Sequence, residues 1–163
     1  MQIFLLFYPA IVTMLSVYCY RWDNQLMQKF YRRMTFSLSA RKLFVLALMM
    51  LMLCFNFCYL QSYGISWPLG IASLLCVSMF SFRMSEKSLV WLQERLHIGI
   101  AFIAMLTCVI EPGLWPLAMN LYIFTIGSIF YPSHKMMRQL SFPEAFSKLA
   151  SNPETLIQGY YSR

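Results

Sequence analysis

Long runs of residues without a charged side chain dominate the sequence, and they limit what the chain can fold into. Four of these runs are equal in length and cover positions 3–20, 43–60, 65–82 and 114–131. A fifth, weaker run is shorter and covers positions 96–110. A helix needs about 20 residues to cross the hydrocarbon core of a bilayer, with a lower limit of about 17. The runs therefore predict membrane-spanning helices, and the weak run has to borrow residues before Leu96 or tilt little.

The composition supports the same interpretation. Of the 163 residues, 60% are hydrophobic and 12% are charged, whereas a soluble domain has about 45–50% apolar and about 25% charged residues. A water-soluble fold of this size is too small to bury so much apolar surface. We therefore predict an all-α, polytopic transmembrane bundle over 1–132, and a cytoplasmic tail over 133–163 with short surface helices near 142–150 and 153–160. The predicted membrane helices are about 3–20, 43–60, 65–82, 92–110 and 114–131.

The first run is expected to be retained as a membrane helix. Its start lacks the positive region of a secretory signal, and no small-x-small cleavage site follows it. Pro9 falls in the second turn, where the lost hydrogen bond costs less than it would in the middle of the helix.

The positive charges occupy every second connection of this five-helix arrangement. The connection after the first run carries six Lys and Arg residues, the connection after the third run carries three, and the tail carries four. The other two connections and the residues before the first run carry none. All 13 Lys and Arg residues then fall on one side of the membrane, and the positive-inside rule makes that side cytoplasmic. The predicted N-terminus is outside and the predicted C-terminus is inside.

The first connection is both basic and amphipathic. Leu26, Phe30 and the pair Met27 and Tyr31 recur at helical spacing, which predicts a short helix lying on the membrane surface. Its cations set the topology, and they are also candidate contacts for anionic lipid headgroups or for an acidic partner protein. These candidate contacts are Arg21, Lys29, Arg32, Arg33, Arg41 and Lys42.

Two parts of the chain align with several identities when Trp67 is placed on Trp115. The alignment suggests two helical hairpins in parallel orientation, formed by the second and third runs and by the fourth and fifth runs. Parallel repeats occur in transporters, and they also occur in scaffolds. The identical residues are Trp67, Pro68, Leu69, Phe82, Ser85, Lys87 and Leu92, which meet Trp115, Pro116, Leu117, Phe130, Ser133, Lys135 and Leu140.

Two amides and one acid stand out within or beside the runs. Asn56 lies in the second run, Asn120 lies in the fifth, and Glu111 lies at the outer boundary beside a Pro-Gly turn. An amide inside a membrane usually faces the bundle and finds a partner. Hydrogen bonding between helices is therefore expected for both amides, with ligand contact as the alternative. Glu111 is interpreted as a solvated acid, with a proton or cation contact as the alternative.

The sequence offers no recognisable set of catalytic residues. Two histidines and six scattered acids form no Ser-His-Asp, Cys-His or paired-carboxylate arrangement, and His97 and His134 are interpreted as interfacial side chains. The five cysteines lie in apolar runs without a Cys-x-x-Cys pair, so they are interpreted as small apolar side chains. We therefore predict no catalysis, no cofactor, no metal and no nucleic-acid partner.

Several short motifs resemble a known family. The segment 114–121 (Leu-Trp-Pro-Leu-Ala-Met-Asn-Leu), Gly127-Ser128, Pro132-Ser133 and 138–140 (Arg-Gln-Leu) resemble small bacterial inner-membrane proteins encoded in aryl-polyene and related fatty-acid-like biosynthesis clusters. Phe7-Tyr8-Pro9 is similar to the N-terminal helix of that family. The resemblance covers about a quarter of the chain. The family continues into further membrane helices, whereas this sequence ends at Arg163.

The resemblance implies a non-catalytic membrane component that serves enzymes making a lipid-like product. We therefore expect a multi-pass protein of the bacterial cytoplasmic membrane, acting as an accessory or scaffold subunit that handles an apolar product. Its expected partners are the lipid bilayer, anionic headgroups and other membrane or cytoplasmic proteins, or further copies of the chain. The alternative is a small oligomeric transporter or channel.

Overall fold

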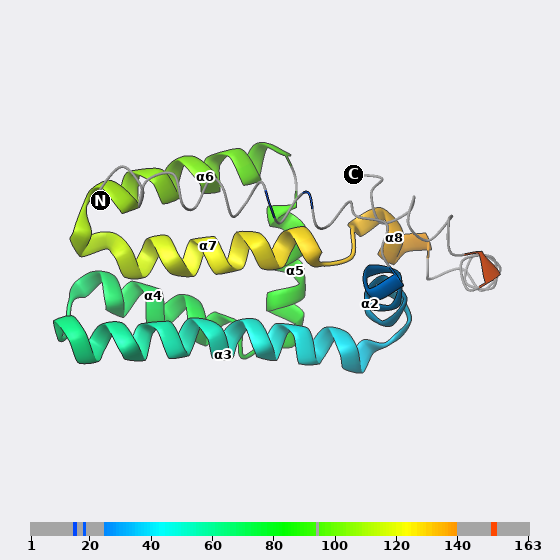
Figure 1. Cartoon of the computed structure of the whole chain (residues 1–163), viewed down its shortest axis with the longest axis horizontal. Coiled ribbons are helices and arrows are strands. Elements are labelled where there is room, and N and C mark those ends of the chain that lie inside the picture. Colours follow the sequence, from blue (N-terminus) through cyan, green and yellow to red (C-terminus); the bar gives the residue numbers. More distant parts are fainter. Residues whose placement is uncertain (1–14, 16–17, 19–24, 94, 140–150, 153–163) are drawn as a thin grey trace.

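The structure is a computed structural model, and it describes residues 15, 18, 25–93, 95–139, 151 and 152 (Figure 1). The described residues are helical and contain no strand, which confirms the all-α prediction. The elements are α2 (Gln25–Phe36), α3 (Leu38–Tyr63), α4 (Trp67–Ser78), α5 (Phe82–Leu92), α6 (Arg95–Ile110), the 3-10 turn η1 (Pro112–Leu114), α7 (Trp115–Phe130) and α8 (His134–Gln139).

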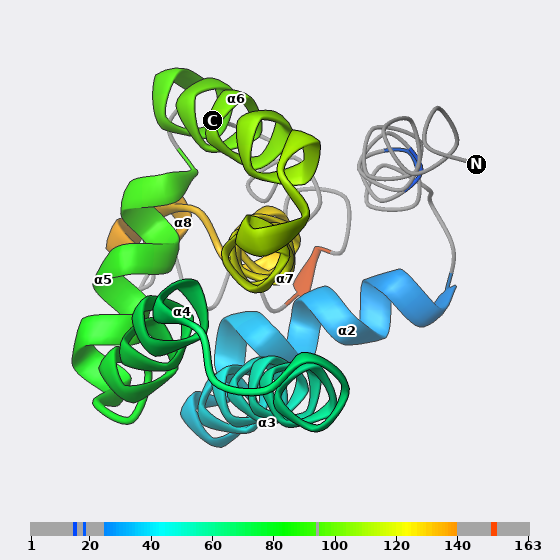
Figure 2. The same cartoon turned by 90° about the vertical axis from the view of Figure 1, so that its left-hand side faces the viewer.

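Four helices lie side by side along the long axis of the molecule, and two lie across it. Figure 1 shows α3, α4, α6 and α7 running along this axis, whereas α2 is seen end-on and α5 runs across. In the end view of Figure 2, α7 lies in the centre with α3, α4, α5 and α6 around it. Of the helices that the structure describes, α7 accordingly has the most residues identified as buried, nine of its 16.

The central position of α7 depends on a close approach to α3. A Cβ atom added at Gly127 would collide with the side chain of Leu48. Because glycine carries no side chain, α3 and α7 can approach closely at this point. Around it lies the larger apolar core, which joins the two helices to α2 and α5 and includes Tyr31, Met52, Leu89 and Tyr131.

Helix α3 contains the predicted run 43–60 and extends beyond it at both ends. It begins after Ser37, whose hydroxyl accepts a hydrogen bond from the Ala40 N–H at 3.2 Å, as an N-cap residue does. It ends at Gly64, whose φ of +78° is a conformation that favours glycine. Both Trp-Pro motifs open a helix, since Pro68 and Pro116 each stand in the first turn, of α4 and α7 respectively.

The predicted helix over 65–82 is wrong at its end, because α4 stops at Ser78. The Ser78 hydroxyl donates to the Leu75 carbonyl at 2.7 Å, and the Met79 and Phe80 N–H groups bond to carbonyls only three residues back. The Ser85 hydroxyl from the next helix then takes the Met79 carbonyl at 2.9 Å. Serine hydroxyls thus occupy carbonyls near the corner, and the chain turns by 109° into α5.

The remaining boundaries differ less. The predicted helix over 92–110 begins at Arg95 because residues up to Leu92 belong to α5, and the helix over 114–131 is α7, preceded by η1. The surface helix predicted in the first connection is α2. Helix α8 was not predicted. The predicted helices 3–20, 142–150 and 153–160 lie outside the described residues.

Among the described helices, α3 alone is long and apolar enough by itself to cross a membrane. Helices α4 and α5 meet the same criterion only when they are taken together as one bent pair. Helix α7 is apolar but contains only 16 residues.

Candidate functional site

Three side chains from three helices meet in the interior of the bundle. The Asn120 amide on α7 donates from Nδ2 to Asn56 Oδ1 on α3 at 2.6 Å. Asn56 Nδ2 donates to Cys76 Sγ on α4 at 3.4 Å, and the Cys76 thiol donates to Asn120 Oδ1 at 3.5 Å. These bonds form a closed ring. The second N–H of Asn120 reaches the Pro116 carbonyl at 2.7 Å, inside α7 itself.

The ring joins α3, α4 and α7 where water is excluded. Asn56 is 6% exposed, and Asn120 and Cys76 are fully buried. A buried amide left without a partner costs about 1–3 kcal/mol, whereas a satisfied pair contributes modestly. The ring therefore fixes which faces of the three helices meet, and it uses the hydrogen bonds that a ligand or a water would otherwise take.

An apolar cavity of about 270 Å³ lies beside this ring. It is bounded by α4, the corner after α4, the end of α5, α6 and α7, with one side chain from α3. Its floor is buried, whereas Ser78, Trp91 and Ile100 at its rim are exposed, so the cavity opens on the surface. The floor includes Met52, Met79, Leu92, Ala101 and Asn120.

Trp91 and His97 form one edge of the cavity. Their rings stack with centroids 3.8 Å apart, and His97 Nδ1 lies 2.9 Å from the Trp91 carbonyl oxygen. Because Nδ1 must carry a proton to donate to a carbonyl, this contact fixes the ring tautomer. The two residues lie on either side of the connection between α5 and α6, and their stacking holds that connection against the cavity.

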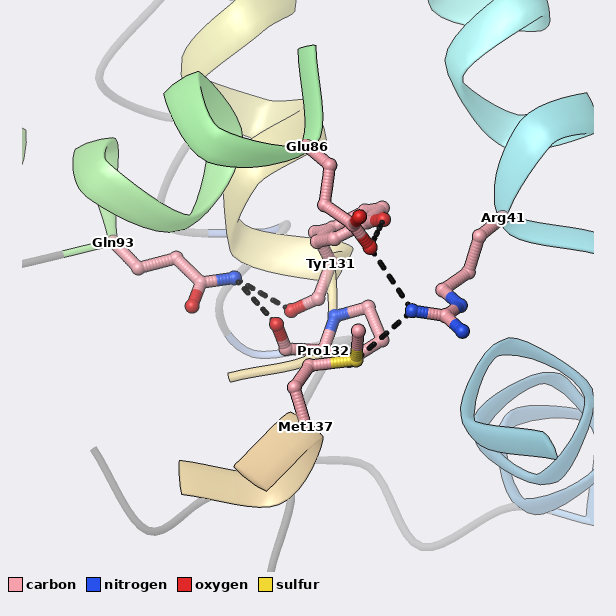
Figure 3. A network of polar contacts seen from close by, with 6 residues as sticks. All are labelled: Arg41, Glu86, Gln93, Tyr131, Pro132 and Met137. Carbon is pink, nitrogen blue, oxygen red and sulfur yellow. Dashed lines mark hydrogen bonds and ion pairs between the residues drawn. The ribbon is translucent and has the colours of Figure 1, made fainter. Parts of the chain in front are cut away.

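A second polar group lies at the end of the bundle where α2 and α8 are found (Figure 3). Arg41 Nη1 on α3 forms an ion pair with Glu86 Oε1 on α5 at 2.9 Å and contacts Met137 Sδ on α8 at 3.1 Å. The Tyr131 hydroxyl donates to the same carboxylate oxygen at 2.7 Å. Burial, together with the adjacent Glu86 carboxylate, raises the pKa of the Tyr131 phenol, so this hydroxyl remains a donor.

Gln93 ties the end of α7 to the end of α5. Its Nε2 atom lies 2.7 Å from the Tyr131 carbonyl oxygen and 3.3 Å from that of Pro132 (Figure 3). The same atom lies 2.9 Å from the Ser128 carbonyl oxygen. Carbonyls at the end of a helix have no partner within the helix. The amide of Gln93 therefore caps α7, and it does so while only 7% exposed.

The structure brings Asn56 and Asn120 together and leaves the other predicted site residues elsewhere. Glu111 is exposed in the connection between α6 and α7. Lys29, Arg32 and Arg33 are exposed on α2, and Lys42 is exposed on α3.

Two of the six predicted surface cations are not among the exposed cations of the described residues. The Arg41 side chain, although grouped with the candidate lipid and partner contacts, is only 12% exposed and is paired with Glu86. Its contacts are internal, so it belongs to the polar group of Figure 3 rather than to the surface. Arg21 lies outside the described residues.

Sequence reasoning missed Cys76, Glu86, Gln93 and Tyr131. Cys76 was interpreted as a small apolar side chain, yet it lies in the last turn of α4, and Asn56 lies two turns before the end of α3. Counting back from the turn between these two helices would have placed the thiol and the amide at similar depths. Glu86 and Gln93 could not be found in this way. They lie in a connection for which the sequence predicted no helix direction, so counting turns could not identify their partners.

Within the part of the chain that the structure describes, no three His, Cys, Asp or Glu side chains lie close enough together to hold a metal ion. Comparison with known protein families, with curated proteins and with solved structures finds no match for this chain. A function can therefore be argued only from the structure itself, from the buried ring, the apolar cavity and the basic end of the bundle.

Proposed function

We propose that this chain is a polytopic protein of the bacterial cytoplasmic membrane, and that it acts as a non-catalytic accessory or scaffold subunit for enzymes whose product is apolar and lipid-like. Its N-terminus lies outside and its C-terminus lies in the cytoplasm. The observation that carries the proposal is a separation on the molecular surface, between large apolar side chains along the bundle and cations near one end of it.

The apolar part of this separation lies on the outer faces of the long helices. Exposed fractions of 54–69% for leucine and methionine side chains on α3 are unusual for a protein in water, where large exposed apolar patches are rare. Lipid tails are a favourable environment for such side chains. The exposed apolar residues include Leu43, Leu46, Met50, Leu51 and Phe57 on α3, Ile71, Leu74 and Val77 on α4, and Ile100 and Ile103 on α6.

The exposed cations that the structure describes lie on four helices: α2, the start of α3, α5 and α8. Figure 1 places α2 and α8 at one end of the bundle, and the pair of Arg41 and Glu86 brings α5 to the level of the first turns of α3. Lys42 Nζ also lies 5.8 Å from the centroid of the Phe82 ring at the start of α5. By the positive-inside rule, this end faces the cytoplasm.

Helix lengths indicate how the bundle crosses the bilayer. Helix α3, with 26 residues, is about 39 Å long and spans the core alone. Helix α4, with 12 residues, is about 18 Å long, and the 109° turn into α5 adds little depth. Helix α4 therefore crosses where the bilayer thins locally, with α5 lying along the cytoplasmic boundary. Helices α6 and α7, at 16 residues each and about 24 Å, fit if the bilayer thins locally.

The exposed cations of α2 supply the surface for the accessory role. Arg32 and Arg33 point away from the core that Tyr31, Met34 and Thr35 enter, so the helix presents a basic face at the membrane boundary. A photoreactive residue at Gln25, exposed two turns before Arg32 on the same helix, is expected to capture a protein in intact cells. The R32Q/R33Q variant is expected to lose that partner while remaining in the membrane, and R83Q/K135Q, which also removes two exposed charges, is expected to keep it.

Capture of lipid alone from position 25 would contradict the accessory role. The alternative, a small oligomeric transporter or channel, requires water beside Asn56 and Asn120. The closed ring of hydrogen bonds around these amides favours the accessory role, since the ring supplies partners to both. Labelling of cysteines introduced at positions 56 and 120 by a water-soluble thiol reagent would support transport instead.

A further inference from the structure

The cavity beside the ring opens sideways, between α4 and α6. It exists because α4 ends at Ser78, short of the end of its apolar run, and because Ala101 and Ala104 leave space on α6. Leu121 and Phe124 of α7, which an extended α4 would cover, line the cavity instead. The opening faces the same surroundings as the exposed apolar residues of α4 and α6, which are Leu74, Val77 and Ile103.

The lining of the cavity suits a hydrocarbon and not a polar group. Ten of the 13 lining residues are apolar or aromatic, and the other three are Ser78, His97 and Asn120. Each of these three has a hydrogen-bond partner within the protein: the Leu75 carbonyl, the Trp91 carbonyl, and Asn56 together with Cys76 and Pro116. Their donors are thus used within the protein, and the rest of the lining offers a polar ligand atom little in exchange for its water, whereas a methylene chain loses nothing on entering.

The size and shape of the cavity fit part of one chain. A buried apolar cavity of about 150 Å³ holds benzene, and the volume here is about 270 Å³. Along α6 the lining runs from His97 to Ala104, about two helical turns, which corresponds to about 10 Å of helix. The cavity thus extends from the level of α5 into the bundle as far as the ring.

A positive charge lies near the α5 edge of the opening. Lys87 stands one helical turn before Trp91, so the two side chains are neighbours on the same face of α5, and both are exposed. A chain whose tail enters the cavity beside Trp91 would leave its head within reach of this ammonium group. The charge complements an anionic head and not a cationic one.

We propose that this cavity binds the hydrocarbon chain of a single-chain anionic amphiphile, with the tail between α4 and α6 and the anionic head beside Lys87. The proposal rests on the membrane location proposed above and names the chemistry of the apolar molecule that the protein handles. The ligand enters from the surrounding lipid, through the opening between α4 and α6 beside Ser78. Entry by this route needs no water-filled path.

The test uses the full chain in nanodiscs and hexadecanoate carrying a diazirine near its methyl end. Irradiation is expected to label peptides around Leu75, Ile100 and Ala104, and unlabelled hexadecanoate is expected to compete more strongly than hexadecanol or hexadecyl-trimethylammonium. Ala101→Phe fills the cavity and is expected to abolish this competed labelling. Gly99→Phe on the same helix, where nothing lies within 4 Å, is the matched control and is expected to retain it.

The head is tested separately. Lys87→Gln is expected to weaken competition by hexadecanoate about threefold and to leave competition by hexadecanol unchanged, because exposed ion pairs contribute little. Lys29→Gln on α2 is expected to change neither. Uniform labelling of the outer face of α3 without competition, or competed labelling that survives Ala101→Phe in a folded protein, would overturn the proposal. Either result would leave the membrane location standing, because the chain would still be embedded in the nanodisc.

Discussion

Helices α4 and α7 begin with the same three residues, Trp-Pro-Leu, yet they differ in length and in surroundings. Helix α4 lies at the edge of the bundle and ends after 12 residues, whereas α7 lies at its centre and continues for 16. Their first turns are alike because proline is favoured there in both. Their ends differ because hydroxyls at Ser78 and Ser85 take up carbonyls at the edge.

The comparison teaches that a shared opening motif fixes where a helix starts and not where it stops. Helix α7 also contains hydroxyls that bond back to its own carbonyls, from Thr125 to Leu121 and from Ser128 to Thr125. It continues nevertheless, because α3, α4, α5 and α6 pack around it and Gln93 caps its end. The shorter α4 leaves the opening of the cavity.

The largest expected effect distinguishes the glycines of the two helices. Gly127→Leu in α7 places a side chain against Leu48 and should destabilise the protein by about 3 kcal/mol, since overpacking a tight contact costs about 1–3 kcal/mol or more. Gly70→Leu in α4 meets nothing within 4 Å and should change the stability by less than about 1 kcal/mol. SDS titration in micelles, followed by circular dichroism, measures both. Equal losses would show that α7 is no more tightly held than α4.

The next effect concerns Asn120, which aligns with Ala72 of α4 when Trp115 is placed on Trp67. Asn120→Leu or Asn56→Leu alone leaves a buried amide without its partner and should cost about 1–3 kcal/mol. The double variant removes both amides and should cost less than the sum of the two single variants. The same SDS titration completes the cycle. Additive losses would mean that the two amides act independently, in spite of the 2.6 Å contact.

A smaller effect is expected from the pair that joins α3 to α5. Glu86→Gln removes the charge that Arg41 and Tyr131 share, and it should cost about 1–2 kcal/mol, less than for a fully buried pair because Arg41 and Glu86 are 12% and 26% exposed. Arg83→Gln, at an exposed position of the same helix, serves as the control. A loss no greater than that of the control would remove the pair from the forces that hold α5.

The smallest effect is expected at the corner between α4 and α5. Ser85→Ala removes the hydroxyl that binds the Met79 carbonyl and should cost about 1 kcal/mol. Ser88→Ala, at an exposed position of the same helix, should leave the stability unchanged. Thermal unfolding in detergent compares the two. If α4 extended beyond Ser78 in the Ser85→Ala variant, the Ser85 hydroxyl would be identified as the group that ends α4.

The apolar runs indicated the positions of most helices, because uncharged stretches of this length form helices wherever water is excluded. They failed at Ser78, since this serine is one of four in the run 65–82, and nothing in the sequence reveals that carbonyls on both sides of it accept serine hydroxyls. They also grouped Arg41 with surface cations, because its partner Glu86 lies far along the sequence, on a helix that runs across the bundle. The amides of the ring were visible as isolated polar residues, whereas Cys76 looked like any small apolar residue.

The central claim is that the chain crosses the membrane through α4, so that the end of α3 and helix α5 lie on opposite sides. It is tested by single cysteines at Ser62 and Ser88, both exposed, in a chain whose five native cysteines are replaced by serine. A membrane-impermeant maleimide added to intact spheroplasts is expected to label position 62, and to label position 88 only after the membrane is opened. Labelling of both positions from the same side would make the pair a re-entrant loop and would contradict the topology proposed for the whole chain.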